Sequence, residues 1–477
     1  MNVTREDLIA LLPLLILTGT TVVVMLAVAV RRSHALSAVL TFLGLAIAFV
    51  SLWIAAPELP RQVTPLLTLD RYAFLYIGLI LAAGMIFVLL AYSYFEKFDD
   101  DHDELYILML VATLGSAVLV SSGHFVALFL GLELLSVALY GMIAYPRRRP
   151  LPLEAGVKYL VLAAVSAAFL LFGMALVYAA LGTMQFDAIA AALTQPRLEG
   201  WLILPGMALI VTGFGFKLAV VPFHLWTPDV YQGAPAPVTA YIATVSKGAM
   251  FALLLRFFYR AAHAAAPLFL LFSIIAIASM FAGNILGLLQ NNVKRILAYS
   301  SIAHLGYLLI AFLASGDLAP TAVAFYLIAY FVTTLGAFGI VGILSDDTSD
   351  ADSLETYRGL FWRRPAVAAI FTIMLFSLAG IPVTAGFIGK FYVVAAGASA
   401  SLWSLVVILV ITSAIGLVYY LRIVVAMYGQ AGHGKTEPPV AFPAGLALIF
   451  LSAALVFLGV FPQPLLALIR SLTMGRI

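Results

Sequence analysis

The chain has 477 residues, of which 64% are hydrophobic and 10% are charged, and its mean hydropathy is +1.11. Soluble domains are about 45–50% apolar and about 25% charged, so this composition indicates an integral membrane protein with many spans. The net charge of +3 gives no indication of nucleic-acid binding, and the lack of cysteine excludes disulfides, thiolate zinc sites and cysteine-ligated iron–sulfur clusters.

Apolar runs long enough to cross a bilayer follow one another along the chain. The first run follows the acidic residues Glu6 and Asp7 and is too long for a cleaved signal, so it is predicted to be a membrane helix. A spanning helix needs about 20 apolar residues. Runs of this kind lie near 8–30, 36–56, 72–92, 105–122, 124–144, 156–181, 201–221, 238–259, 267–289, 297–315, 320–344, 366–390, 401–428 and 440–461. The sequence therefore predicts an all-α polytopic fold of about fourteen transmembrane helices.

Two of these predicted helices contain an internal proline that breaks them. The breaks lie at LAVVPFHLWTP (218–228) in the seventh helix and at LAGIPVTAGFIGK (378–390) in the twelfth. Each broken helix is the fourth in a block of five, helices 4–8 and helices 9–13, and an odd number of helices inverts the second block in the membrane. Broken helices at matching places in two repeats are typical of a transport site.

The whole chain, residues 1–477, is predicted to form a single integral membrane domain. Its parts are helices 1–3 (1–95), the first repeat (105–260), the second repeat (267–430), and helix 14 with the C-terminus (438–477). Lysine and arginine are more frequent in the loops opposite the termini, for example at 147–149, than in the loops on the termini side. The positive-inside rule therefore predicts that both termini lie outside the cytoplasm.

Five ionisable residues lie inside the apolar runs, namely Lys158, Lys217, Lys247, Lys390 and Glu133. A charge at a helix centre costs about 2.5–3.5 kcal/mol on insertion scales, and such residues are most often found in ion paths and proton relays. Four of them also have a simpler interpretation, while Lys247 lies near the midplane, too deep to reach the surface. Lys158 can form an i,i+4 pair with Glu154, Lys217 can reach the membrane surface, Lys390 can mark a helix end, and Glu133 can be a structural partner.

Polar side chains on the neighbouring helix faces favour a path. Glu133, Ser136 and Tyr140 share one face of a helix. The triads Ser300, His304, Tyr307 and Tyr326, Tyr330, Thr333 share faces of two others. Such stripes predict a hydrated polar axis through the bundle, although small and hydroxyl residues also join membrane helices by packing.

Several long segments resemble the antiporter-like membrane subunits of respiratory complex I, the proton-pumping NADH:quinone oxidoreductase. They are FLGLELLSVALYG (129–141), FGFKLAVVPFHLWTPDVYQGAPAPV (214–238), NVKRILAYSSIAHLGYLL (292–309) and LAGIPVTAGFIGKFYV (378–393). The likeness runs from LIALLPLL (8–15) to PQPLL (462–466) and is nearest to the subunit-N branch of that family. It implies fourteen helices, two inverted five-helix repeats and broken helices 7 and 12.

The resemblance also implies roles for individual residues. It implies a Glu133–Lys217 pair, a connecting Lys247 and a terminal Lys390 that together form a proton relay. Lys158, His224 and His304 match further polar positions of the family, and Ser136, Tyr140 and Tyr307 are expected to support the path. The lysine at position 390 favours subunit N over subunit M, which typically has glutamate there.

The resemblance places the redox chemistry in partner subunits. NADH, FMN, iron–sulfur clusters and quinone are expected there, and no cofactor or metal is expected in this chain. The expected neighbours are other membrane-arm subunits, especially the antiporter-like subunit M and the small subunit K, together with membrane lipids and without nucleic acid. The expected location is the bacterial inner membrane, with both termini periplasmic. A cation/proton antiporter subunit without redox coupling and an assembly scaffold remain as alternatives.

Overall fold

The computed structural model describes residues 4–98, 102–193, 201–264, 266–316, 318–430 and 439–473, apart from the side chains of 260–264. The N-terminal part forms α1 (Arg5–Ala10), α2 (Leu12–Val30), α3 (His34–Ala55), η1 (Ala56–Glu58), β1 (Arg61–Thr64), β2 (Leu67–Leu69) and α4 (Arg71–Phe95). The first predicted repeat forms α5 (Asp103–Val120), α6 (Phe125–Ile143), α7 (Pro150–Leu181), α8 (Phe186–Leu193), α9 (Ile203–Leu218), α10 (Trp226–Gly233), α11 (Ala236–Tyr241), η2 (Ile242–Ser246) and α12 (Lys247–Ala264). The second predicted repeat forms α13 (Ala266–Leu288), α14 (Val293–Leu313), α15 (Leu318–Leu344), η3 (Leu354–Tyr357), α16 (Leu360–Arg363), α17 (Pro365–Ala379), α18 (Ala385–Ser399) and α19 (Trp403–Tyr428). The chain ends with α20 (Phe442–Val460) and α21 (Gln463–Thr473).

The fourteen predicted spans all correspond to helical segments of the structure. Twelve helices of the described chain are long and apolar enough to cross a membrane. The two remaining predicted spans are the broken ones, which the structure divides into α9 and α10 and into α17 and α18. The fold is therefore the polytopic, almost entirely helical membrane protein that the sequence predicts.

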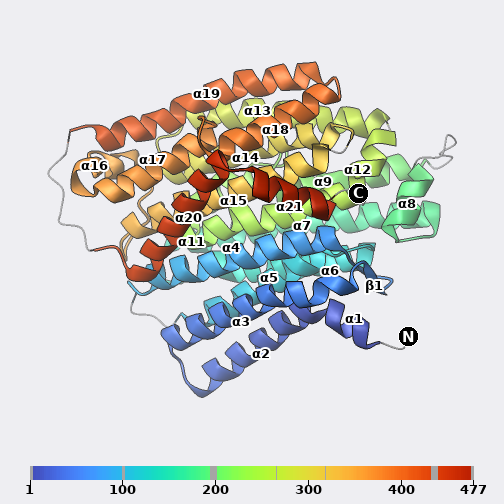
Figure 1. Cartoon of the computed structure of the whole chain (residues 1–477), viewed down its shortest axis with the longest axis horizontal. Helices are drawn as coiled ribbons and strands as arrows, with labels where there is room; N and C mark the ends of the chain where they lie inside the picture. The colour runs from blue at the N-terminus through green and yellow to red at the C-terminus, as the bar shows by residue number, and fades with distance from the viewer. Residues whose placement is uncertain are drawn as a thin grey trace.

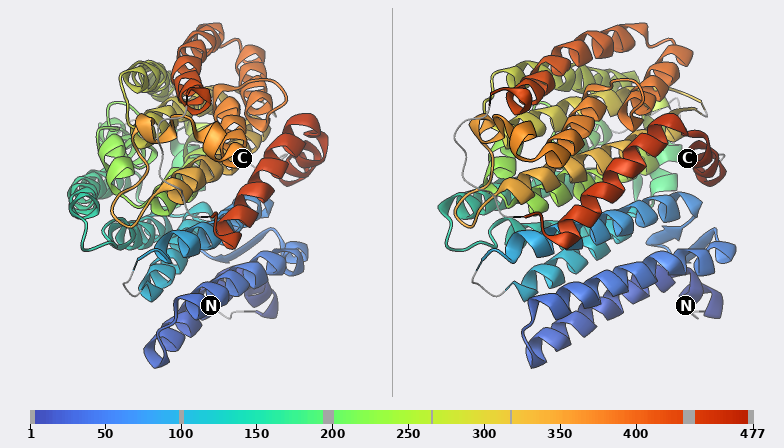
Figure 2. Two further views of the ribbon diagram at one scale, coloured as in Figure 1. Left: turned by 90° about the vertical axis from the view of Figure 1, so that its left-hand side faces the viewer. Right: turned by 60° about the vertical axis from the view of Figure 1, so that its left-hand side comes forward.

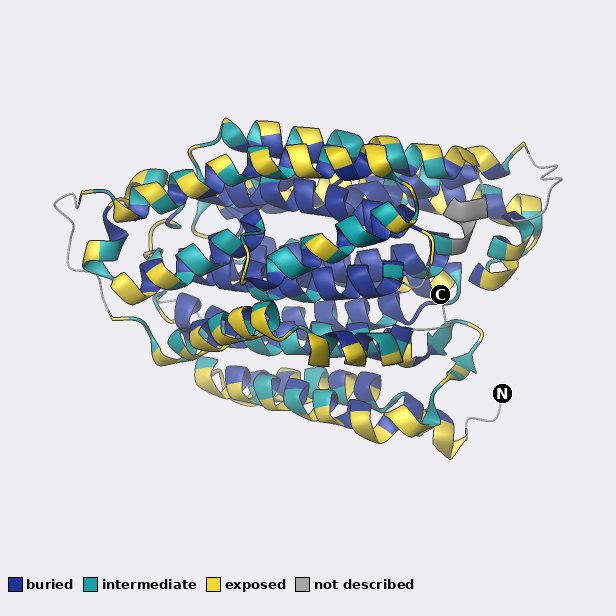
Figure 3. Cartoon of the chain, turned by 45° about the horizontal axis from the view of Figure 1, so that its top comes forward, coloured by how far each residue is buried: buried dark blue, intermediate teal, exposed yellow. Residues whose placement is uncertain are grey.

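The helices lie side by side in one bundle (Figure 1). The N-terminal helices α2 and α3 form one edge, α19 lies at the opposite edge, and α20 crosses the outside of the bundle against α4, α15 and α18 (Figures 1 and 2). Helices α1 and α21, the first and last of the described chain, lie at the same end, as an even number of spans requires. Buried residues gather in the middle of the bundle, while exposed residues follow its outer helices (Figure 3).

The helix before each break ends at a residue with a left-handed backbone conformation. Helix α9 stops at Ala219 (φ 60°), and helix α17 stops at Gly380 (φ 83°). Pro222 and Pro382 follow, and neither can donate the backbone hydrogen bond that would continue a helix. In the first break the freed N–H of Val221 donates to Ser279 Oγ on α13, at 2.9 Å. A neighbouring helix thus satisfies part of the backbone that the break exposes.

A short β-hairpin is the one local departure from the all-helical prediction within the described residues. Strands β1 and β2 pair antiparallel, with Arg61 opposite Leu69 and Gln62 opposite Thr68. Pro57, Pro60 and Pro65 lie in and around this connection between α3 and α4. Proline disfavours helix and is tolerated at the edges of sheets, so this segment forms a hairpin instead of extending α3.

Candidate functional site

Lys217 lies in the last turn of α9, immediately before the first break, and its side chain is buried within the bundle. Only 3% of the residue is exposed. Its ammonium donates to Ser136 Oγ on α6 at 2.6 Å and to Tyr159 OH on α7 at 3.2 Å. Lys217 therefore does not reach the surface, and two hydroxyl groups from other helices surround its charge.

Glu133 lies on the same face of α6 as Ser136 but is only half-buried. No ion pair or hydrogen bond joins it to Lys217 in the described part of the chain. Lys217 instead reaches α6 at Ser136, three residues further along, which is about 4.5 Å along a helix. Lys217 thus bonds Ser136 directly, and the carboxyl group of Glu133, its predicted charge partner, lies close to this contact on the same helix. Tyr140, the third member of this face, packs its ring against Tyr159 at 5.6 Å.

Lys247 lies in the interior of the bundle at the point where the eighth span changes its helical pitch. The wider π-helical turn η2 ends at Ser246, and α12 begins with Lys247. Such turns are rare and occur frequently at functional sites. Lys247 is 1% exposed, and its ammonium donates to Ser301 Oγ on α14 at 2.8 Å.

The short helix α10 contributes aromatic rings to the surroundings of both lysines. Its Trp226 ring lies 4.8 Å from the ring of Tyr159, the hydroxyl partner of Lys217. The ammonium of Lys247 lies 5.9 Å from the Trp226 ring and 5.1 Å from the ring of Tyr231. Electron-rich ring faces stabilise a nearby ammonium. The rings of α10 therefore contact both Lys247 and the hydroxyl partner of Lys217.

A group of hydroxyl and imidazole side chains continues from Lys247 into the second predicted repeat. Ser301, which accepts from Lys247, also accepts from Tyr330 OH at 2.8 Å. The Tyr330 ring lies 5.5 Å from the imidazole of His304. His304 bonds Tyr326 OH through Nδ1 at 2.8 Å and Tyr420 OH through Nε2 at 3.3 Å. Both ring nitrogens of His304 are therefore held by hydroxyl groups, and Tyr420 in turn bonds Ser300.

Lys390 lies on α18 at the second break and reaches back across it. Its ammonium donates to the carbonyl oxygen of Ala379 and to Ser413 Oγ on α19, both at 2.8 Å. It also lies 5.3 Å from the ring of Tyr307, whose ring lies 5.5 Å from that of His304. Lys390 is thus part of the break itself and is linked to His304 through a single aromatic ring.

Tyr307 is held in place by Tyr419 and by Asn284, of which Asn284 was not predicted as a path residue. Asn284 donates to Tyr307 OH at 2.8 Å and accepts from Tyr419 OH at 3.1 Å. A cavity of about 10 Å³ lies beside His304 and is lined also by Thr333 and Ser377. This size is close to the minimum that holds one water molecule. Thr333 and Ser377 bond each other at 3.0 Å.

Two predicted path residues, Lys158 and His224, lie apart from the row of contacts that runs from Lys217 through Lys247 and His304 to Lys390. Lys158 is 44% exposed and forms ion pairs with Glu154 at 2.7 Å and with Asp229 at 3.1 Å, so the simpler i,i+4 interpretation describes its surroundings. His224 is buried in the first break, but its Nδ1 has no hydrogen-bond partner in the described part of the chain. Neither residue contacts Lys217 or Lys247 through a hydrogen bond there.

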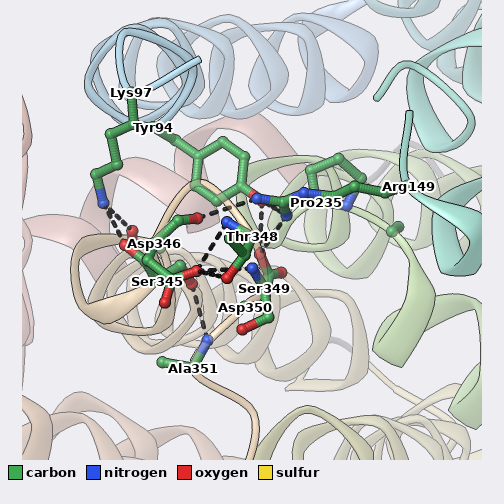
Figure 4. A network of polar contacts seen from close by, with 12 residues as sticks. Tyr94, Lys97, Arg149, Pro235, Ser345, Asp346, Thr348, Ser349, Asp350 and Ala351 are labelled. Atoms are coloured by element: carbon green, nitrogen blue, oxygen red, sulfur yellow. Dashed lines mark hydrogen bonds and ion pairs between the residues drawn. The ribbon is translucent and has the colours of Figure 1, made fainter. Parts of the chain in front are cut away.

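A second buried lysine network was not predicted. Lys294 in the first turn of α14 is fully buried and bonds Asp350 of the 345–353 loop, which follows α15. Tyr94, Lys97 and Arg149 surround the same loop (Figure 4). The predicted span begins at residue 297 and therefore leaves out Lys294, which stands beside Arg295 in a polar segment.

Two groups of this network lie outside the spanning helices and have shifted pKa values. Burial lowers the pKa of the Lys97 ammonium, and the charge of Asp350 opposes this shift. Burial alone raises the pKa of Asp346, but hydrogen bonds from Thr348 and Ser349 outweigh it and hold the pKa below its ordinary value. Asp346 is therefore charged at neutral pH and fixes the turn of the loop.

Comparison with known proteins gives one family match and several similar structures. The family model described as NADH:quinone oxidoreductase/Mrp antiporter, TM, matches residues 122–416. A chain of respiratory complex I from Thermus thermophilus, solved with bound Aureothin, is 34% identical, with a TM-score of 0.83, and the match covers 95% of this chain and 98% of that one.

Two further solved structures share the fold at lower identity. A chain of the Mrp complex from Dietzia sp. DQ12-45-1b is 19% identical with a TM-score of 0.86, and a chain of the membrane-bound sulfane sulfur reductase, an archaeal respiratory membrane complex, is 24% identical with a TM-score of 0.83. Each match covers 98% of this chain and 97% of the other.

Proposed function

Because this chain belongs to the NADH:quinone oxidoreductase/Mrp antiporter transmembrane family, we propose that it is a proton-translocating membrane-arm subunit of NADH:quinone oxidoreductase. The observation that carries the proposal is the row of contacts from Lys217 through Lys247 and His304 to Lys390. This row places three lysines within one bundle and surrounds each with groups that exchange protons.

Protons move along this row by changes in the charge of its lysines. Burial favours the neutral amine, while a nearby carboxylate or a set of hydroxyl oxygens favours the ammonium. A shift of charge near Glu133, driven by quinone reduction in another subunit, changes the balance between the neutral amine and the ammonium form of Lys217. Its proton then passes through water molecules to Lys247, along the Ser301–Tyr330 contact and further water to His304, and on to Lys390. Lys390 and the break beside it connect the row to the outer side.

The proposal includes the surroundings of the chain. We assign it to the subunit-N position, beside the antiporter-like subunit M and the small subunit K, in a bacterial inner membrane with both termini periplasmic. NADH, FMN, iron–sulfur clusters and quinone belong to partner subunits. The higher identity to the Thermus complex I chain than to the Mrp chain favours this position over a cation/proton antiporter subunit without redox coupling.

Gentle affinity purification of the tagged chain, followed by mass spectrometry and a vesicle assay, tests the proposal. We expect flavin and iron–sulfur subunits to co-purify, and NADH oxidation to pump protons only in vesicles that contain the chain. Purification with antiporter subunits alone would assign the chain to a cation/proton antiporter. Vesicles that pump fully without the chain would contradict the proposal.

A further inference from the structure

Helix α10 is anchored at its C-terminal end by a buried lysine. The ammonium of Lys294 donates to the carbonyl oxygen of Ala234, the residue that caps α10, at 2.6 Å. The last carbonyl groups of a helix carry a partial negative charge, so a cation at this position stabilises the helix end. Lys294 is completely buried, and the contact is therefore not weakened by solvent.

Asp350 holds Lys294 from the opposite side. Its Oδ2 lies 2.5 Å from Lys294 Nζ, and its Oδ1 accepts from Tyr94 OH at 2.5 Å. Arg149 lies 3.7 Å from the same carboxylate and donates to the backbone oxygen of Asp346 at 3.0 Å. The 345–353 loop is thus bound to α4 and to the segment before α7, as Figure 4 shows. Lys294 connects the 345–353 loop to α10.

The side of α10 that faces outward is held by a second set of charges. Asp229 accepts from Arg295 at 2.8 Å and pairs with Lys158 at 3.1 Å. Gln232 accepts from the same arginine at 3.1 Å. The same helix carries Trp226 and Tyr231, the two rings that lie near Lys247. A shift of the α10 anchor therefore moves these rings relative to both buried lysines.

We propose that Lys294 and Asp350 are positioning residues that fix α10 and thereby set proton exchange between Lys217 and Lys247. This inference rests on the proposed function and adds two residues that do not themselves carry the transferred proton. Helix α10 has eight residues and is about 12 Å long, so its anchor lies close to the rings it positions. A misplacement of about 1 Å can cost roughly 100-fold in rate where geometry controls transfer.

A double-mutant cycle tests this positioning role. Lys294→Met removes the anchor, and Tyr231→Leu removes the ring that faces Lys247. Proton pumping coupled to NADH oxidation is measured in vesicles and divided by the amount of assembled complex. If Lys294 acts through α10, each single change lowers pumping roughly tenfold, and the double change costs little more than either one because coupled residues are not additive.

Lys97→Met is the matched control. Lys97 is a lysine of the same network, but its ammonium donates to carbonyl oxygens of Gly342, Ile343 and Ser345 at the end of α15 and does not contact α10. We expect near-normal pumping per assembled complex for Lys97→Met, and an additive effect when it is combined with Tyr231→Leu.

Two outcomes would overturn the inference: normal pumping per assembled complex in Lys294→Met, or an additive cycle with Tyr231→Leu. If Lys294→Met does not assemble, Lys294→Gln keeps a donor for Ala234 without the charge, and Asp350→Asn removes the charge of the partner. The same two criteria apply to those variants. Failure of this inference leaves the proposed function intact, because loss of pumping on substitution of Lys217 does not depend on Lys294.

Discussion

Each of the three lysines in the row donates to a serine on another helix. The acceptors are Ser136 for Lys217 at 2.6 Å, Ser301 for Lys247 at 2.8 Å and Ser413 for Lys390 at 2.8 Å. A hydroxyl group can accept from an ammonium and donate to the next acceptor. The serines therefore stabilise the charged lysines while leaving a route by which the proton leaves.

Ser136→Ala tests this arrangement at a single residue. A hydrogen bond to a charged group contributes about 1.5–3 kcal/mol, so its loss disfavours the ammonium form of Lys217. We expect pumping per assembled complex in vesicles to fall roughly tenfold or more. Ser121→Ala is the control, because the equally buried Ser121 hydroxyl bonds the carbonyl of Ala117 one turn earlier and, within the described part of the chain, no lysine. Equal pumping in the two variants would show that the contact has no role.

Sequence alone identified the lysines of the row but not all of their partners. Lys217, Lys247 and Lys390 stand out because each interrupts an apolar run. Lys294 was missed because its sequence neighbours are polar, although the fold buries it completely. Tyr159, Ser301 and Ser413 were missed for a different reason. A single hydroxyl in a membrane helix is common, and only the packing of the helices shows which ones meet a lysine.

At the scale of the helices, the two breaks and the π-helical turn position the three lysines of the row. Lys217 precedes the first break, Lys390 follows the second, and Lys247 follows η2. The prolines predicted both breaks, with boundaries only a few residues from those observed. The π-helical turn η2 was not predicted, because such a turn depends on tertiary packing and has no characteristic residue pattern.

Gly380→Ala tests the second break. Gly380 has φ 83°, and an added Cβ would lie 2.7 Å from Cδ of Lys390. The left-handed backbone costs a residue with a side chain about 1–2 kcal/mol, and the contact also displaces the lysine. We expect proton pumping per assembled complex to fall roughly several-fold, because a displaced Lys390 is less well placed for proton transfer.

Gly182→Ala is the matched control for Gly380→Ala. Gly182 also caps a helix, α7, with φ 67°, but an added Cβ there meets no atom within 4 Å. Gly182→Ala has the same free-energy cost of a left-handed backbone but displaces no lysine. We therefore expect lower stability of the protein and normal proton pumping. A similar loss of pumping in both variants would mean that displacement of Lys390 is not the cause.

At the scale of the whole molecule, α4 joins the N-terminal helices to both predicted repeats. Near its start, Asp70 forms a two-pronged ion pair with Arg256 of α12 at 2.8 and 3.1 Å. In its last turn Tyr94 bonds Asp350, and just after its end Lys97 caps α15. These long-range contacts were not predictable from sequence, because residue spacing does not show which distant charges meet.

Arg256→Met tests the first of these contacts. The side chains of Arg256 and Asp70 are 13% and 9% exposed, and removing one partner of a buried pair costs about 3–5 kcal/mol. We expect a clear fall in the thermal unfolding temperature of the purified protein. The control Arg358→Gln removes a pair in which both side chains are more than half exposed, at 64% and 70%, and should change little. An unchanged unfolding temperature in Arg256→Met would contradict this role of the pair.

Proton pumping by a complex that carries Lys217→Ala tests the central claim most directly. NADH oxidation and proton uptake are measured together in membrane vesicles, at equal amounts of assembled complex. We expect the variant to assemble and to lose most of its NADH-driven pumping, because Lys217 begins the row that leads to Lys390. Full pumping in an assembled complex with Lys217→Ala would contradict the account.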